Sequence, residues 1–170
     1  VWMTSVTPKP KFYWPLDEET GTTTSDVSGN ANTGTLHGTA SWTTGYLGSA
    51  LSMNGSDNFI STTTSLSAPN VFTLAVRFRT SAAKAGTMIG IANSQTGASS
   101  NYDRDIEMTA DGKVTFFVYD GAHQEISSTE SYNDGNWHHV AATLSSAGLA
   151  LYVDGNLVAS KSGVIRGETT

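Results

Sequence analysis

The chain of 170 residues contains no cysteine, and only 14% of its residues are charged, against a usual share of about a quarter. Without cysteine there is no disulfide framework and no thiolate metal site. No apolar run reaches the length of about 18 residues that a membrane-spanning helix needs, so no membrane insertion is predicted. Nine basic residues stand against fifteen acidic ones, and the net charge of −6 argues against a nucleic-acid partner, which needs a basic face.

What the chain does contain is serine, threonine and glycine. Together, 21 Ser and 24 Thr make 45 residues, and Gly adds 17. Short β-branched or aromatic runs alternate with Gly, Asn and Asp, and no segment keeps a helical period for three turns. About a dozen short strands with frequent turns predict an all-β, antiparallel two-sheet sandwich of the jelly-roll kind. The length fits one domain.

Four segments carry the clearest strand signals. Residues 12–16 predict a first strand that Pro15 confines to an edge or an end. Residues 72–80 alternate apolar and polar side chains, which is typical of a half-buried strand. Residues 106–118 predict a hairpin across Asp111-Gly112 with a type I′ turn, and residues 149–160 predict another across Asp154-Gly155.

Several blocks of sequence resemble laminin-G-like modules of the concanavalin A-like lectin/glucanase superfamily. The blocks are YWPLDE at 13–18 with DVSGN at 26–30, ALSMNGSD at 50–57, FTLAV at 72–76, and DGNWHHVAA at 134–142 with LYVDG at 151–155. The resemblance implies a concanavalin A-like jelly roll and an extracellular or cell-surface location. It is a weaker guide to the ligand, because this fold hosts lectin-like modules, accessory domains of glycan hydrolases and adhesion units.

The function predicted from this resemblance is a non-catalytic binding or adhesion module that recognises a glycan or protein through rim loops. A purely structural assembly domain of a larger surface protein is the alternative from another class. A glycan array run with and without Ca²⁺ separates the two, because only a binding module gives hits.

The polar loops contain a candidate metal site. Ca²⁺ binds carboxylate, amide and carbonyl oxygens, and the resemblance implies a structural Ca²⁺ near the loop of residues 26–30. The alternative is that these side chains only bond their own backbone in Asx turns. The candidate ligands are Asp26, Asn30, Asn32 and Asp57.

Sugar recognition calls for aromatic rings bordered by planar polar side chains, because ring faces stack on the sugar and its hydroxyls bond amides, carboxylates and guanidinium groups. Packing is the alternative for every aromatic side chain and is the better interpretation for Trp14 and Trp137. The predicted ligand-binding residues lie in or beside two turns: Tyr102, Arg104, Asp120 and His123.

A glycoside hydrolase is the third and weakest interpretation. Asp103, Asp105 and Glu107 share one face of an extended strand, and paired carboxylates perform glycoside hydrolysis. The alternative is a solvent-facing strand. The neighbouring His138 and His139 point to opposite faces of their strand, so a packing or capping role is predicted for them instead of a shared metal.

The boundaries carry a further expectation. Residues 1–11, with Pro8 and Pro10, predict an extended linker, and residues 12–170 the jelly-roll domain. Laminin-G-like modules continue with further strands beyond the position of Gly163–Thr170. The domain is therefore expected to be incomplete at its C-terminus, and to be completed by a separate segment, a partner chain or a swapped dimer.

Overall fold

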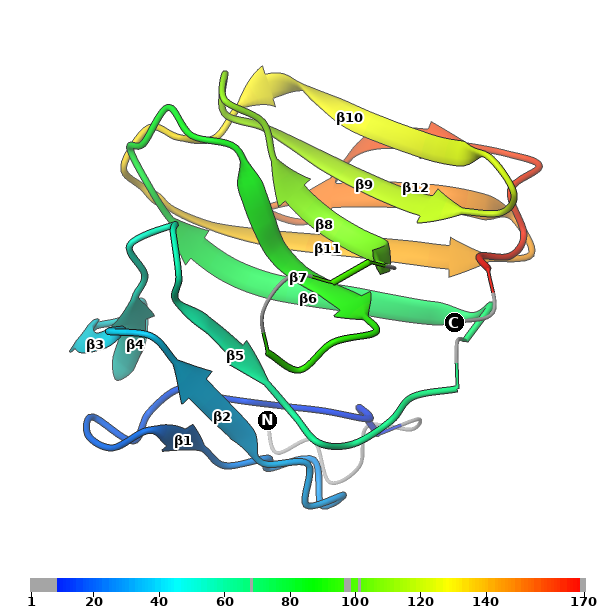
Figure 1. The fold of residues 1–170 in the computed structure, drawn as a ribbon. Coiled ribbons are helices and arrows are strands. Elements are labelled where there is room, and N and C mark those ends of the chain that lie inside the picture. The colour runs from blue at the N-terminus through cyan, green and yellow to red at the C-terminus, as the bar shows by residue number, and fades with distance from the viewer. Residues whose placement is uncertain (1–8, 68, 97–98, 101, 169–170) are drawn as a thin grey trace, which may run out of the picture. The chain divides into compact units, whose positions relative to one another are not determined.

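A computed structural model describes residues 9–67, 69–96, 99–100 and 102–168, and these form thirteen strands (Figure 1). Within these ranges no helix is long and apolar enough to cross a membrane. The N-terminal unit, Val1–Ser65, contains β1 (Thr23–Thr24), β2 (Gly34–His37), β3 (Ser41–Thr44), β4 (Ser49–Ser52) and β5 (Phe59–Ser61). The C-terminal unit, Leu66–Thr170, contains β6 (Phe72–Arg79), β7 (Gly86–Ala92), β8 (Tyr102–Met108), β9 (Lys113–Tyr119), β10 (His123–Ser131), β11 (Trp137–Ser145), β12 (Gly148–Val153) and β13 (Asn156–Lys161).

The N-terminal unit has a three-stranded sheet in the order β1-β2-β5 and a hairpin of β3 with β4. The strand predicted at residues 12–16 does not form. Pro15 removes a backbone donor, and Leu16 has a φ of 61°, outside the β region. Tyr13 is held instead by its N–H on Asp26 Oδ1, at 2.9 Å, and by its carbonyl, which accepts the Val27 N–H at 2.9 Å.

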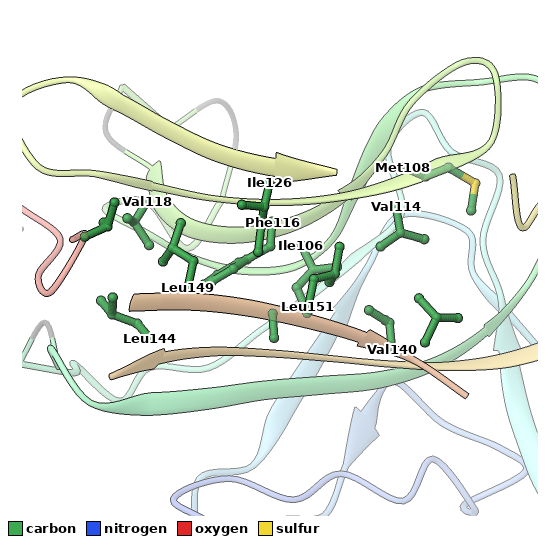
Figure 2. Close-up of a cluster of buried hydrophobic side chains, with 13 residues drawn as sticks. Ile106, Met108, Val114, Phe116, Val118, Ile126, Val140, Leu144, Leu149 and Leu151 are labelled. Atoms are coloured by element: carbon green, nitrogen blue, oxygen red, sulfur yellow. The ribbon is translucent and has the colours of Figure 1, made fainter. Parts of the chain in front are cut away.

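The C-terminal unit is a sandwich of two four-stranded antiparallel sheets, in the orders β10-β9-β8-β7 and β13-β12-β11-β6. Apolar side chains from both sheets meet in one core, which Figure 2 shows. Phe116 and Ile106 from the first sheet are fully buried, as are Leu144, Leu151 and Val140 from the second. The predicted all-β, two-sheet fold is confirmed.

Strand β6 has the alternating burial that its sequence predicts. Its side chains alternate strictly between half-buried and exposed along all eight residues. Leu74 and Val76 pack against the core, while Arg77 and Arg79 are exposed. The predicted half-buried strand is therefore confirmed.

Of the two predicted hairpins, one has a two-residue turn and the other has a longer loop. Asp154 and Gly155 have φ of 50° and 81° and connect the paired residues Val153 and Asn156, so the predicted hairpin forms, with a two-residue turn of type I′. The turn at residues 110–112 is not type I′. The Thr109 and Lys113 backbones bond across three residues and only Gly112 has a positive φ, of 84°, so this is a longer loop closed by a left-handed glycine.

His138, from the WHH motif, joins two turns. Its Nδ1 lies 2.8 Å from Asp154 Oδ2 and its Nε2 lies 3.1 Å from Asp134 Oδ1. The ring packs edge-on to Tyr132, at 5.1 Å between ring centroids. The packing and capping role predicted for this residue is confirmed. Burial lowers the pKa of His138, but the two carboxylates outweigh burial and raise it above its ordinary value.

Replacing His138 with Gln should lower the free energy of unfolding by about 1–3 kcal/mol below pH 6, because two charge-assisted bonds are lost. The native pKa is raised, so the contribution is fully present below the unfolded pKa of about 6.5 and is lost as pH rises through the native value. Urea denaturation at pH 5.5 and pH 9 measures it. His139→Gln is the matched control, because the hydrogen bonds between His139 and Asp154 are made by the His139 backbone: its N–H donates to Asp154 Oδ1 and its carbonyl accepts the Asp154 N–H. An equal loss at both pH values would contradict the charged bridge.

Candidate functional site

The start of β8 holds an ion pair that is buried completely. The Arg104 guanidinium bonds the Asp103 carboxylate, and the two side chains are 0% and 2% exposed. Arg104 has a φ of 63°, a left-handed conformation that costs a non-glycine residue on the order of 1 kcal/mol. This interrupts the strand alternation, so the four residues 103–106 are all buried. A strained, buried charge is maintained only where the surroundings satisfy it.

Both carboxylate oxygens of Asp103 are satisfied by donors. Oδ1 accepts the Arg104 N–H and the Tyr119 N–H, each at 2.7 Å. Oδ2 accepts the guanidinium and the Glu168 N–H, the latter at 3.1 Å. The guanidinium in turn donates to the Pro69 carbonyl at 2.9 Å and to the Glu168 carbonyl at 3.1 Å. One ion pair thereby ties the segment before β6, the end of β9 and the segment after β13 to β8.

A surface pocket of about 330 Å³ opens over this ion pair. Its walls come from the segments that the pair connects: the one before β6, the β9–β10 turn and the one after β13, which share one end of the sandwich in Figure 1. Its lining offers an amide, two carboxylates, a guanidinium and two bare glycine backbones. The lining residues are Asn70, Asp120, Gly121, Arg166, Gly167 and Glu168.

The four predicted ligand-binding residues differ in how they relate to this pocket. Asp120 lines it directly. Arg104 lies in a strand, not in a loop, and its side chain is buried beneath the pocket. Tyr102 is the first residue of the same strand. His123 begins β10, half exposed, where its ring lies against Phe117 at 4.6 Å and its Nδ1 lies 3.6 Å from Glu125.

Sequence reasoning missed the other half of the pocket. Asn70 lies 34 residues from Arg104 and Glu168 lies 64 from it, and no local pattern marks either residue. No sequence pattern marks Gly167 either, although other atoms already fill the space that a side chain at this position would need. A Cβ there would lie 2.6 Å from Asp103 Oδ2 and 2.8 Å from Arg104 Cζ. Only glycine lets the chain pass this close to the ion pair.

Gly167→Ala should therefore destabilise the protein by about 1–3 kcal/mol, because the added methyl group would displace the buried ion pair. Gly86→Ala is the matched control, since no heavy atom lies within 4 Å of a Cβ at that position. Thermal melts of the two variants beside the wild type measure the difference. If both alanine variants melt together, the close approach at Gly167 is not a constraint.

The acidic strand does not form the predicted set of three carboxylates. Asp103 belongs to the ion pair, and Asp105 is also buried, so the solvent-facing alternative is corrected as well. Asp105 Oδ1 accepts the Ile91 N–H at 3.2 Å, and Glu107 accepts the Thr87 hydroxyl at 3.1 Å. Burial first, then the charges of Glu107 and Asp103, raise the pKa of Asp105 to about 7, against the weaker effect of the Ile91 N–H.

Asp105→Asn should increase the free energy of unfolding at pH 8 by about 2–4 kcal/mol and change it little at pH 4. A raised carboxyl pKa means that the native state holds a proton that the unfolded chain releases above pH ~4. Wild-type stability therefore falls as pH rises from about 4 to about 7, and the amide removes this loss. Urea denaturation across this pH range tests it. A pH-independent difference between the two proteins would contradict the buried ionisation.

The predicted metal residues do not fit a cation as they are arranged. Asp26 Oδ1 accepts the Tyr13 and Ser28 N–H groups, and Oδ2 accepts the Ser28 hydroxyl and the Asn32 N–H, all at 2.8–2.9 Å. Partial burial raises the pKa of Asp26, but these four bonds outweigh it and hold the pKa well below its ordinary value. The hydrogen bonds favour the Asx-turn alternative, because every lone pair already has a donor.

The remaining candidate ligands do not join Asp26 in one set of oxygens, and the Asn32 amide oxygen accepts the Thr64 hydroxyl at 2.7 Å. Asn30 and Asn32 donate to the Lys11 carbonyl at 3.1 and 2.8 Å. Asp57 lies in a separate turn, where its carboxylate accepts from the Asn54 amide at 2.6 Å. Among the described residues there is no group of three or more His, Cys, Asp or Glu residues placed to hold a metal. Ca²⁺ binding stays a prediction without support from this geometry.

Comparison with known proteins identifies the family. Residues 54–170 match the family described as the concanavalin A-like lectin/glucanases superfamily, within its laminin-G group, and the chain belongs to it. No curated protein sequence matches the chain.

Solved structures extend this result at the level of fold. Domain 4 of AbnA, a GH43 extracellular arabinanase from Geobacillus stearothermophilus, solved with arabinotriose, has a TM-score of 0.67 at 17% identity; the match covers 85% of this chain and 73% of that chain. The binding domain of botulinum neurotoxin DC, solved with rat synaptotagmin II, has a TM-score of 0.67 at 15% identity, covering 93% of this chain and 40% of that chain. An S-layer domain-containing protein from Clostridium thermocellum has 0.55 at 22%, covering 91% and 73%. At these identities the likeness shows the fold alone.

Proposed function

We propose that this chain is a non-catalytic carbohydrate-binding module whose glycan enters the pocket above the buried ion pair. The observation that carries the proposal is that pocket. Its rim combines the Asp120 and Glu168 carboxylates, the Arg166 guanidinium and the Asn70 amide. Groups of this kind bond the hydroxyls of a sugar by polar contacts, without the aromatic stacking that the sequence predicts, since none of the six lining residues is aromatic. The ion pair beneath them holds the chain segments in place before the ligand arrives.

The comparisons support the class of ligand and not its identity. One similar structure is an arabinanase domain with bound arabinotriose, and another is a toxin domain with a bound protein receptor. A rim of separate polar groups without a broad apolar patch suits a hydroxylated ligand better than a protein surface, which needs a buried apolar centre. An extracellular location is part of the same proposal, in keeping with the extracellular arabinanase and the S-layer protein.

A glycan array that includes arabino-oligosaccharides, followed by titration calorimetry of the hits, tests the proposal. We expect dissociation constants in the range of ~1 μM to ~1 mM and a loss of roughly tenfold or more in the double variant Asp120→Asn, Arg166→Gln. The control is Lys113→Gln, which changes a cation on β9 that pairs with Asp111 at 3.3 Å, away from the pocket.

Other outcomes identify the alternatives. An array without hits would overturn the proposal in favour of an assembly domain. Release of reducing ends from β-glucans, abolished by Glu107→Gln, would replace it with a glycoside hydrolase acting through Asp105 and Glu107. Hits that the double variant leaves unchanged would place the glycan elsewhere on the molecule.

A further inference from the structure

A second surface pocket, of about 310 Å³, lies within the N-terminal unit. It is formed where residue Glu19 meets the hairpin of β3 with β4, which is labelled in Figure 1. Its size is at the lower end of the range of ligand pockets, ~300–1,000 Å³, so it suits a small group such as a sugar ring. We call it the Trp42 pocket, and its lining residues are Glu19, Trp42, Thr43, Thr44, Gly48 and Ser49.

Hydrogen bonds on both sides of Glu19 fix the walls of the Trp42 pocket to each other. Before Glu19 in the chain, the Leu16 carbonyl accepts the Ser49 hydroxyl at 2.7 Å. After it, the Gly21 carbonyl accepts the indole N–H of Trp42 at 3.1 Å. The indole ring and the segment that carries Glu19 are therefore held together without a ligand, which lowers the cost of ordering the pocket when a ligand binds.

The backbone at Glu19 adopts a strained turn. Glu19 has a φ of 61°, and the Thr20 N–H donates to the Glu18 carbonyl at 2.7 Å. This is a γ-turn with a positive φ at its centre, the rarer and more strained of the two γ-turn forms. Strained backbone of this kind is concentrated at ligand-binding sites, where the surroundings hold it in place.

The Glu19 side chain has no partner in the part of the chain that the structure describes. It is exposed, and its carboxylate makes no hydrogen bond or ion pair there. The charges around it do not supply a partner in excess either, because residues 9–65 contain five carboxylate side chains, two lysines and no arginine. The local potential of this unit therefore attracts a cation.

The lining residues of the Trp42 pocket together favour one class of ligand. A carboxylate makes charge-assisted hydrogen bonds with an ammonium group. The face of an indole ring attracts a cation and also stacks on the apolar face of a sugar. Thr43 and Thr44 add hydroxyl groups, which both donate and accept hydrogen bonds as the hydroxyls of a sugar do. A ring with hydroxyls and an ammonium group satisfies all three, whereas a lysine side chain uses only the carboxylate and the indole.

We propose that the Trp42 pocket binds an amino sugar that has a free ammonium group, as in a polysaccharide that has lost its N-acetyl groups. The Glu19 carboxylate bonds the ammonium group, and the Trp42 indole receives the apolar face of the sugar ring. The pocket above the buried ion pair shares no lining residue with this one and has no aromatic residue in its lining. The proposal requires nothing of that pocket, so either proposal can fail alone.

Matched oligosaccharides test the role of the ammonium group. Calorimetric titration with glucosamine oligomers and with N-acetylglucosamine oligomers is carried out at about pH 5.5, where carboxylates are ionised and amines are protonated. We expect the glucosamine oligomers to bind roughly tenfold or more tightly than the acetylated ones, and Glu19→Gln to remove this preference. Glu19→Gln breaks no contact of the fold. Glu130→Gln, the same change at an exposed residue of β10, is the matched control and should leave binding unchanged.

Tryptophan fluorescence tests the role of the indole. Glucosamine oligomers should change the tryptophan emission of the wild type, and Trp42→Phe should remove this change and weaken binding roughly two- to tenfold. The control is Trp137→Phe, which alters a ring on β11 that stacks with Arg79 at 5.1 Å, and it should keep the change in emission. A change in emission that Trp42→Phe leaves intact contradicts the site.

Four other results would overturn the proposal. Equal binding of the two oligosaccharides would show that the ammonium group is not recognised. Lysine oligomers that bind as tightly as glucosamine oligomers would show that a cation alone is recognised and not a sugar. An equal effect of Glu130→Gln would show attraction to the acidic chain as a whole. Loss of binding in the double variant Asp120→Asn, Arg166→Gln would move the amino sugar to the pocket above the ion pair.

Discussion

The end of the sandwich that carries the pocket depends on one physical constraint, the cost of removing two charges from water. Arg104 and Asp103 are buried, and each would carry a penalty of several kcal/mol without partners. They stay because Asp103 accepts from the backbone at Tyr119 and Glu168, while Arg104 donates to the Pro69 and Glu168 carbonyls. Because the polar atoms of this ion pair need hydrogen-bond partners, segments without regular secondary structure, before β6 and after β13, lie next to the start of β8. The loops that line the pocket are thereby connected to strand β8 of the sandwich by hydrogen bonds.

The two sheets of the sandwich place their charged side chains differently, for reasons that can be traced to single strands. On β8 the carboxylates of Asp105 and Glu107 bond groups of β7, and Asp105 is so enclosed that its pKa rises to about 7. On the other sheet, β6 and β11 present Arg77, Arg79 and Trp137. A single small sandwich therefore has a polar pocket at one end and a cation–π contact between Arg79 and Trp137 on one sheet. Both lie on a scaffold that the shared apolar core holds in place.

The His138 hydrogen bonds and the Arg104–Asp103 ion pair show how burial determines the contribution of a charged side chain to stability. His138 is 12% exposed on its side chain and bonds two carboxylates that remain near water, so its contribution changes with pH. Arg104 is fully enclosed, and breaking its pair would leave an uncompensated buried charge at a cost of about 3–5 kcal/mol. The His138 hydrogen bonds connect two turns near the surface. The ion pair determines where three chain segments meet.

Local chemistry determined much of the strand pattern of this protein, although not the segment at residues 12–16 or the turn at residues 110–112. The alternation at β6, the type I′ turn at Asp154-Gly155 and the opposite faces of His138 and His139 follow from a two-residue period and from backbone preferences. The site was decided by contacts that no local period encodes. The Glu168 N–H reaches Asp103 across 65 residues, Gly167 matters only because an ion pair lies against it, and Arg104 is buried because its left-handed backbone interrupts the alternation. Likewise, whether Asp26 holds a metal or its own backbone depends on which donors the folded chain brings to its oxygens.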